Sequence, residues 1–160
     1  MCAKQATPTE AQFHKKMAIS FFNETWKFLD KPDRTPEEDA RMIHLAHASR
    51  LHWEFVGTQE NLAIGEWQVS RVHAVLGQPD SALYHAKRSL AIAERNSLGP
   101  FHLACGHEAI ARAFSISHSG AASEHIAIAR KIALEITDPE GKETLDKDLF
   151  DIEAGYRSDA

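Results

Sequence analysis

Apolar side chains recur every three to four residues along most of the chain, which is the spacing of one face of an α-helix. Prolines, glycines and short polar stretches interrupt this pattern at regular intervals. No alternation of period two and no Asn-Gly or Asp-Gly turn occurs, so we expect no β-strands. The pattern therefore predicts seven helices, over about residues 9–29, 35–56, 58–77, 79–96, 100–118, 122–137 and 138–156.

Several helix boundaries carry specific signals. Thr9 is followed three residues later by Gln12, which makes a capping box that holds the first turn. Thr35 precedes Pro36 and three acidic residues, and Thr58 precedes the next apolar stretch, so both are expected N-caps. Gly77 is expected just after the end of the third helix, where a left-handed backbone conformation often terminates a helix.

A stretch of the chain is written twice. NLAIGEWQVSRVHAVLG, which begins at Asn61, reappears as HLACGHEAIARAFSISH, which begins at His102. The offset is 41 residues and then falls to 40, and the matching pairs include Gly65/Gly106, Arg71/Arg112, Ala82/Ala122 and His85/His125. A helical hairpin repeated at about 40 residues is typical of an α-solenoid, in which units bury their apolar faces by stacking on each other.

We therefore predict an all-α fold in one domain that spans residues 1–160. The hairpins are expected at 58–98 and 99–137, and an amphipathic helix over 138–156 is expected to cap the stack. A third, degenerate hairpin is expected at 9–57, because LAHASR in the second predicted helix resembles LYHAKR in the fourth at an offset of 38.

The hairpin pattern resembles that of the tetratricopeptide-repeat (TPR) family, in a longer variant with a period of about 40 rather than 34 residues. The residues that carry the resemblance are the small Ser70 and Ala111 in the first helices, Gly77 at the turn, and Ala82 and Ala122 early in the second helices. The resemblance implies a right-handed superhelix of about three hairpins, whose first helices line a concave groove that binds peptides or partner proteins.

Composition narrows the class of protein. The net charge is −5 over 160 residues, so a nucleic-acid partner is not expected, because such proteins normally present a basic face. No apolar run approaches the roughly 20 residues that a membrane span requires, and no secretory leader is recognisable. Cys2 and Cys105 make no disulfide framework. We expect a cytoplasmic protein that holds no cofactor.

One helical face of the repeat is the expected binding site. The resemblance to the TPR family implies that this face lines the groove. Its candidate binding residues are Ile64, Trp67, Gln68, Arg71, Glu108 and Arg112. Arg71 and Arg112 stand at the same repeat position, and two guanidinium groups on neighbouring helices suit a carboxylate or a phosphate. Alternatively, each arginine pairs with Glu108 or another acid of the chain and holds the helices in register.

Ten histidines are an unusual number for a chain of this length. His44 and His47 share a face of the second predicted helix, and Glu66 or His73 would have to complete a metal site from the third. The alternative is that the histidines make hydrogen bonds between helices, as the recurrence of His47, His85 and His125 suggests. We predict no metal site, with His44, His47 and Glu66 as the weaker metal candidates.

The sequence contains no nucleophile elbow, phosphate loop or zinc-protease motif, so an enzyme is not expected. The preferred hypothesis is a non-enzymatic scaffold that binds a protein or peptide, one with an acidic group if the arginines take part. A small metal-dependent or acid/base enzyme at the histidine and glutamate cluster is one alternative. A structural protein that self-associates as a homodimer through the apolar edge of the first helix is another.

Overall fold

The computed structural model describes residues 8–117 and 119–158, and every regular element in these residues is a helix. The seven helices are α1 (Glu10–Leu29), α2 (Pro36–Val56), α3 (Gln59–Val75), α4 (Pro79–Arg95), α5 (Pro100–Ile116), α6 (Ala122–Ala133) and α7 (Pro139–Ser158). None of them, among the residues described, is long and apolar enough to cross a membrane. The predicted all-α architecture is confirmed.

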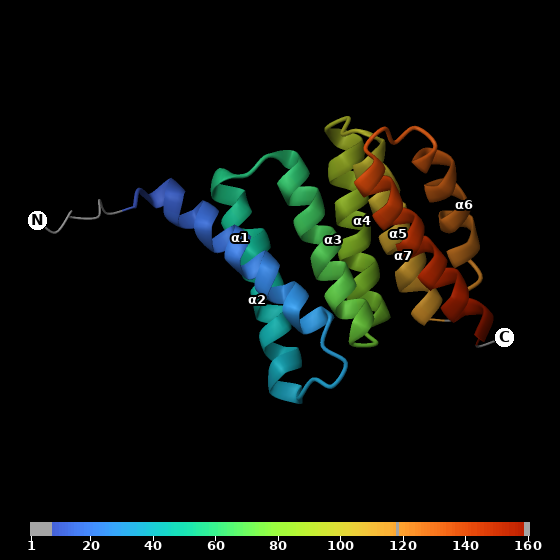
Figure 1. Cartoon of the computed structure of the whole chain (residues 1–160), viewed down its shortest axis with the longest axis horizontal. Coiled ribbons are helices and arrows are strands. Elements are labelled where there is room, and N and C mark those ends of the chain that lie inside the picture. The colour runs from blue at the N-terminus through green and yellow to red at the C-terminus, as the bar shows by residue number, and fades with distance from the viewer. Residues whose placement is uncertain (1–7, 118, 159–160) are drawn as a thin grey trace, which may run out of the picture.

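The helices pack in consecutive pairs. α1 packs on α2, α3 on α4 and α5 on α6, and each pair also contacts the next (Figure 1). α7 lies against α5 and α6 at the end of the row (Figure 1). Because each pair mainly contacts its neighbours in sequence, the molecule has the layout of an α-solenoid.

The helix starts follow the sequence signals. Thr9, Thr35 and Thr58 each accept a hydrogen bond from a backbone N–H in the first turn, and each completes a capping box with the residue three positions later. Gly77 has a φ of 67°, a left-handed conformation that glycine adopts without steric cost. The predicted N-caps and the glycine after α3 are therefore confirmed.

The ends of α5 and α6 differ from the prediction. α6 ends at Ala133 and does not continue towards Thr137, because tighter turns replace the α-helical ladder there, with Glu135 N–H donating to the Ile132 carbonyl. α5 ends at Ile116, and its predicted last residue, His118, lies outside the described residues.

Gly65 and Gly106 both lie where a helix of one hairpin crosses the second helix of the hairpin before it. A Cβ added to Gly65 would lie 2.7 Å from Arg50 Cδ, and one added to Gly106 would lie 2.8 Å from Leu90 Cα. Both glycines are buried. Their shared repeat position therefore corresponds to a shared close contact, as the sequence repeat implied.

The first hairpin follows the repeat in a different register from the one predicted. Ser49 Oγ donates to the Ala18 carbonyl at 2.8 Å, and Ser89 Oγ donates to the Ala63 carbonyl at 2.9 Å. These equivalent contacts relate α2 to α4 by 40 residues, the offset that also separates Arg50 from Leu90. The offset of 38 inferred from LAHASR and LYHAKR is therefore wrong, since it does not describe how α2 packs.

Candidate functional site

Most of the predicted groove residues of α3 and α5 come together where these two helices meet α7. Trp67 is 8% exposed and Glu108 is 1% exposed. The Trp67 indole Nε1 donates a hydrogen bond of 2.6 Å to Glu108 Oε2. Arg112, one turn further along α5, donates from Nε to Glu108 Oε1 at 2.8 Å. A buried carboxylate is thus satisfied by one neighbour from each of the two helices.

The two repeat-related arginines meet the same acid of α7. Arg71 Nη1 lies 2.9 Å and Arg112 Nη2 lies 3.6 Å from Asp148 Oδ1. Burial by itself would lower the pKa of Arg112, but Glu108 and Asp148 raise that pKa above its usual value. Both arginines therefore pair with acids of the chain itself, as expected if they hold the helices in register.

Arg71 also stacks on aromatic rings. Its guanidinium carbon lies 5.2 Å from the ring centre of Trp26 and 5.5 Å from that of Trp67. A guanidinium over an indole face is attracted by the ring quadrupole. Arg71 consequently links α1, α3 and α7 at one point.

Beside this network lies an apolar cavity of about 270 Å³. α1, α3, α5 and α7 all contribute to it, with Phe22, Trp26, Ile64, Trp67, Phe101, Cys105, Glu108, Thr144, Leu145 and Asp148 in its wall. Burial, followed by Glu108 and Asp148, raises the pKa of the Cys105 thiol well above its usual value, so the thiol is neutral. The cavity offers apolar and aromatic surface rather than a nucleophile.

Gln68 has a different position from the other predicted groove residues. It is fully buried, and its side-chain amide donates a hydrogen bond of 3.0 Å to the Phe22 carbonyl of α1. The side chain thus ties α3 to α1, whereas Ile64, Trp67 and Glu108 line the cavity.

Glu66 is the most heavily paired acid in the hairpin of α3 and α4. It accepts hydrogen bonds from His85 Nδ1 at 2.7 Å and from Arg88 Nε at 3.0 Å, and Arg50 Nε lies 3.1 Å away. Burial alone would raise the pKa of Glu66, but His85, Arg88 and Arg50 together lower it below its usual value. Glu66 is therefore a carboxylate, suited to orienting a histidine rather than to donating a proton.

The histidines group differently from the expectation. His44 lines a surface hollow of about 500 Å³ beside Glu37 and Arg41, and it is not part of the group of ring nitrogens that contains His47. His47 instead faces His73 and His85, with one ring nitrogen of each within 4.8 Å of the others. The predicted equivalence of His47 with His85 and His125 is wrong, since His85 pairs with Glu66 and His125 with His107, whereas His47 contacts His85 itself.

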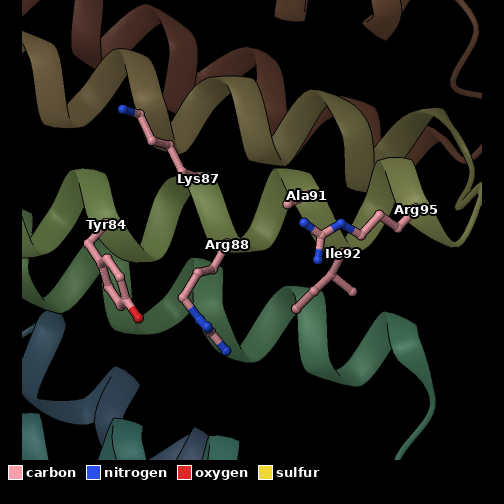
Figure 2. Close-up of a pocket in the computed structure, with 6 residues that line it drawn as sticks. All are labelled: Tyr84, Lys87, Arg88, Ala91, Ile92 and Arg95. Atoms are coloured by element: carbon pink, nitrogen blue, oxygen red, sulfur yellow. The ribbon is translucent and has the colours of Figure 1, made fainter.

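A further surface hollow of about 300 Å³ lies along α4, and Figure 2 shows its six lining residues. Tyr84 and Arg88 point to one side of the helix, and Lys87 points to the other (Figure 2). Arg88 is engaged with Glu66, so this hollow adjoins the histidine cluster.

Sequence reasoning missed Asp148 and the partners of His73. The sequence identifies the helix that contains Asp148 only as the one that covers the end of the stack. Several acidic residues lie near Asp148 in the sequence, so nothing distinguishes it from an ordinary solvent-exposed charge. Gln78, whose Oε1 lies 2.7 Å from His73 Nδ1, follows Gly77 in a turn. The repeat alignment held one usable signal, since Glu66 and His107 occupy the same repeat position opposite His85 and His125.

Comparisons with protein-family models, with curated protein sequences and with solved structures give no match.

Proposed function

We propose that this protein is a non-enzymatic binding scaffold, with a TPR-like arrangement of helical hairpins, that holds a short apolar segment of a partner protein or peptide. The observation that supports the proposal is the apolar cavity of about 270 Å³ between α1, α3, α5 and α7. Concave, mostly apolar sites with a few fixed polar groups are the usual form of ligand sites in proteins.

The walls of the cavity suggest the kind of segment it accepts. Trp26, Trp67 and Phe101 present aromatic surface, and a buried aromatic or aliphatic anchor residue typically supplies most of the affinity of such contacts. Asp148 already neutralises Arg71 and Arg112, so an acidic group of a ligand would have to displace it. We therefore base the proposal on an apolar anchor, with an acidic neighbour in the ligand as an addition.

The test is a selection of short peptides from a displayed library against the full chain, followed by affinity measurements on cavity variants. Thr144 lines the cavity from an exposed position on α7, so Thr144→Trp fills the cavity with little change to the core. The exposed Glu143 is next to it and does not line the cavity, so Glu143→Trp is the matched control. We expect Thr144→Trp to weaken peptide binding at least about tenfold, or about 1.4 kcal/mol, and Glu143→Trp to leave it unchanged. Equal affinity of both variants for every selected peptide rejects the cavity as the site.

Self-association is a second candidate, favoured by the apolar surface of the first hairpin. Phe13, Leu51 and Phe55 are 50%, 54% and 62% exposed. A second copy of the chain could cover this face by a symmetric contact. Solution mass measured with Phe55→Asp tests it, with Leu134→Asp, at the exposed residue that follows α6, as the control. A monomer at all concentrations of the unmodified chain contradicts this candidate.

A further inference from the structure

Three histidines from three different helices converge at one point of the molecule. His47 lies on α2, His73 on α3 and His85 on α4. Their ring centroids are 5.2 Å apart for His47 and His85, 5.6 Å for His73 and His85, and 5.8 Å for His47 and His73. One ring nitrogen of each lies within 4.8 Å of the others.

This triangle is close to what a metal ion requires. Zinc–imidazole bonds of about 2.0–2.1 Å in tetrahedral geometry place ligand nitrogens about 3.3 Å apart and ring centroids about 5 Å apart. The observed centroid distances exceed that value by less than 1 Å, and binding of a common ion requires the rings to rotate until their nitrogens, now within 4.8 Å of one another, reach the shorter spacing.

Neighbouring side chains fix the orientation of two of the three imidazole rings. His85 Nδ1 lies 2.7 Å from Glu66 Oε2, and His73 Nδ1 lies 2.7 Å from Gln78 Oε1. Because Glu66 is a carboxylate and an amide oxygen only accepts, each Nδ1 carries the proton and each Nε2 keeps a free lone pair. Histidine ligands of metal ions are generally held in this way by a carboxylate or carbonyl on the other ring nitrogen.

His47 completes the set from the solvent side. It is exposed, and among the residues that the structure describes it makes ring contacts with His73 and His85 but no hydrogen bond. The exposed side leaves room for water or another ligand as the fourth donor.

From this convergence we propose that His47, His73 and His85 form a binding site for a divalent transition-metal ion, zinc being the ion whose geometry it fits best. Imidazole nitrogens suit zinc, copper, iron and nickel. Cys105, the cysteine among the described residues, lies in the cavity wall and takes no part in this site. Glu66 and Gln78 act as positioning residues that fix the rings without touching the ion.

The next hairpin contains a natural control for this site. His125 corresponds to His85 and His107 to Glu66, but Phe114 takes the place of His73. His107 and His125 face each other with their Nδ1 atoms 2.9 Å apart, and this pair has no third histidine among the described residues. Phenylalanine is therefore a side chain that the repeat itself accommodates at the position of His73.

The experiment is a zinc titration by calorimetry of the full chain after removal of bound metal with a chelator, repeated with cobalt to record the ligand-field spectrum. We expect one zinc ion per chain and the intense visible absorption of tetrahedral cobalt. His73→Phe is expected to reduce zinc affinity at least about 100-fold, and Gln78→Ala about tenfold, the usual range for ligand-orienting partners. His125→Phe is expected to leave affinity within about twofold.

Thermal unfolding with and without zinc separates loss of the site from loss of the fold. Zinc raises the melting temperature of the unmodified chain and of His125→Phe, because an ion that binds only the folded state stabilises it. It has no effect on His73→Phe, whose metal-free melting temperature shows whether the fold is intact. The proposal is overturned if the unmodified chain binds less than one ion. It is equally overturned if a folded His73→Phe retains full affinity, or if His125→Phe loses as much affinity as His73→Phe.

Discussion

Trp67 and Glu108, which are joined by a hydrogen bond of 2.6 Å, occupy the same position of successive repeats, 41 residues apart. One copy of the repeat supplies an indole donor at this position, and the next copy supplies a carboxylate acceptor. Stacking of equivalent helices brings equivalent positions together, and the different residues at this position in the two repeats form a complementary pair.

Replacing Trp67 by Phe is expected to lower the free energy of unfolding by about 1–3 kcal/mol, because the buried Glu108 loses a donor. Urea denaturation monitored by circular dichroism measures the change. Trp53→Phe is the matched control: Trp53 is half-buried and no hydrogen bond of its indole is found in the described structure, so we expect a loss below about 1 kcal/mol. Equal losses in the two variants would contradict the role assigned to the hydrogen bond.

Asp148→Asn is expected to destabilise the docking of α7. The side chain is 10% exposed and faces both Arg71 and Arg112, so the neutral amide leaves Arg71 without its ion-pair partner. Breaking a buried ion pair from one side typically costs about 3–5 kcal/mol, and the retained Glu108 contact of Arg112 places the expected loss at about 2–3 kcal/mol. Amide hydrogen exchange along α7 should accelerate together with the loss of stability.

Asp146→Asn provides the comparison for this charge removal on the same helix. Its carboxylate is 46% exposed and lies 3.9 Å from Arg130, where solvent screens the interaction. We expect unchanged exchange along α7. If Asp148→Asn also leaves exchange and stability unchanged, the ion pairs do not hold α7 in place.

Gly106→Ala is expected to be more harmful than Gly65→Ala. The new Cβ at Gly106 meets the Leu90 backbone at 2.8 Å, whereas at Gly65 it meets the Arg50 side chain first, at 2.7 Å. A helix backbone cannot move aside as a side chain can, so we expect a loss of about 1–3 kcal/mol for Gly106→Ala and a smaller one for Gly65→Ala. Thermal unfolding measures both, with Gly120→Ala as the control, since nothing lies within 4 Å of a Cβ there.

The stability of the protein should fall as the solution is acidified. Burial, followed by His125, lowers the pKa of His107 below its usual 6.5 although Glu94 opposes this. Burial also lowers the pKa of His125, which Lys87 lowers further and Glu124 opposes. Between these lowered values and 6.5 the unfolded chain binds more protons than the folded one, so the free energy of unfolding decreases as pH falls through this window.

Urea unfolding from about pH 7.5 to about pH 5, with a chelator present to exclude bound metal, measures this slope. The double variant His107→Gln/His125→Gln should show a shallower dependence, because two of the groups responsible are gone. An unchanged slope in that variant would assign the pH dependence to other groups.

The sequence by itself determined the elements of this protein and their repetition. Capping boxes, prolines at helix starts and Gly77 act through contacts within a few residues, so Thr9, Thr35 and Thr58 could be placed without knowledge of the fold. The repeat at an offset of 41 likewise predicted the close contacts of Gly65 and Gly106. Where the same close contact recurs in each repeat, glycine recurs at the same repeat position.

Only the tertiary structure decided which polar groups meet. Each residue advances a helix by about 100°, so the difference between offsets of 38 and 40 turns a side chain by about 200°. His47 therefore faces His73 and His85 instead of occupying the repeat position of His85 and His125. Asp148 contacts Arg71, which lies 77 residues earlier in the chain, because α7 packs against α5 and α6 at the end of the row. No pattern within a few residues encodes such a contact.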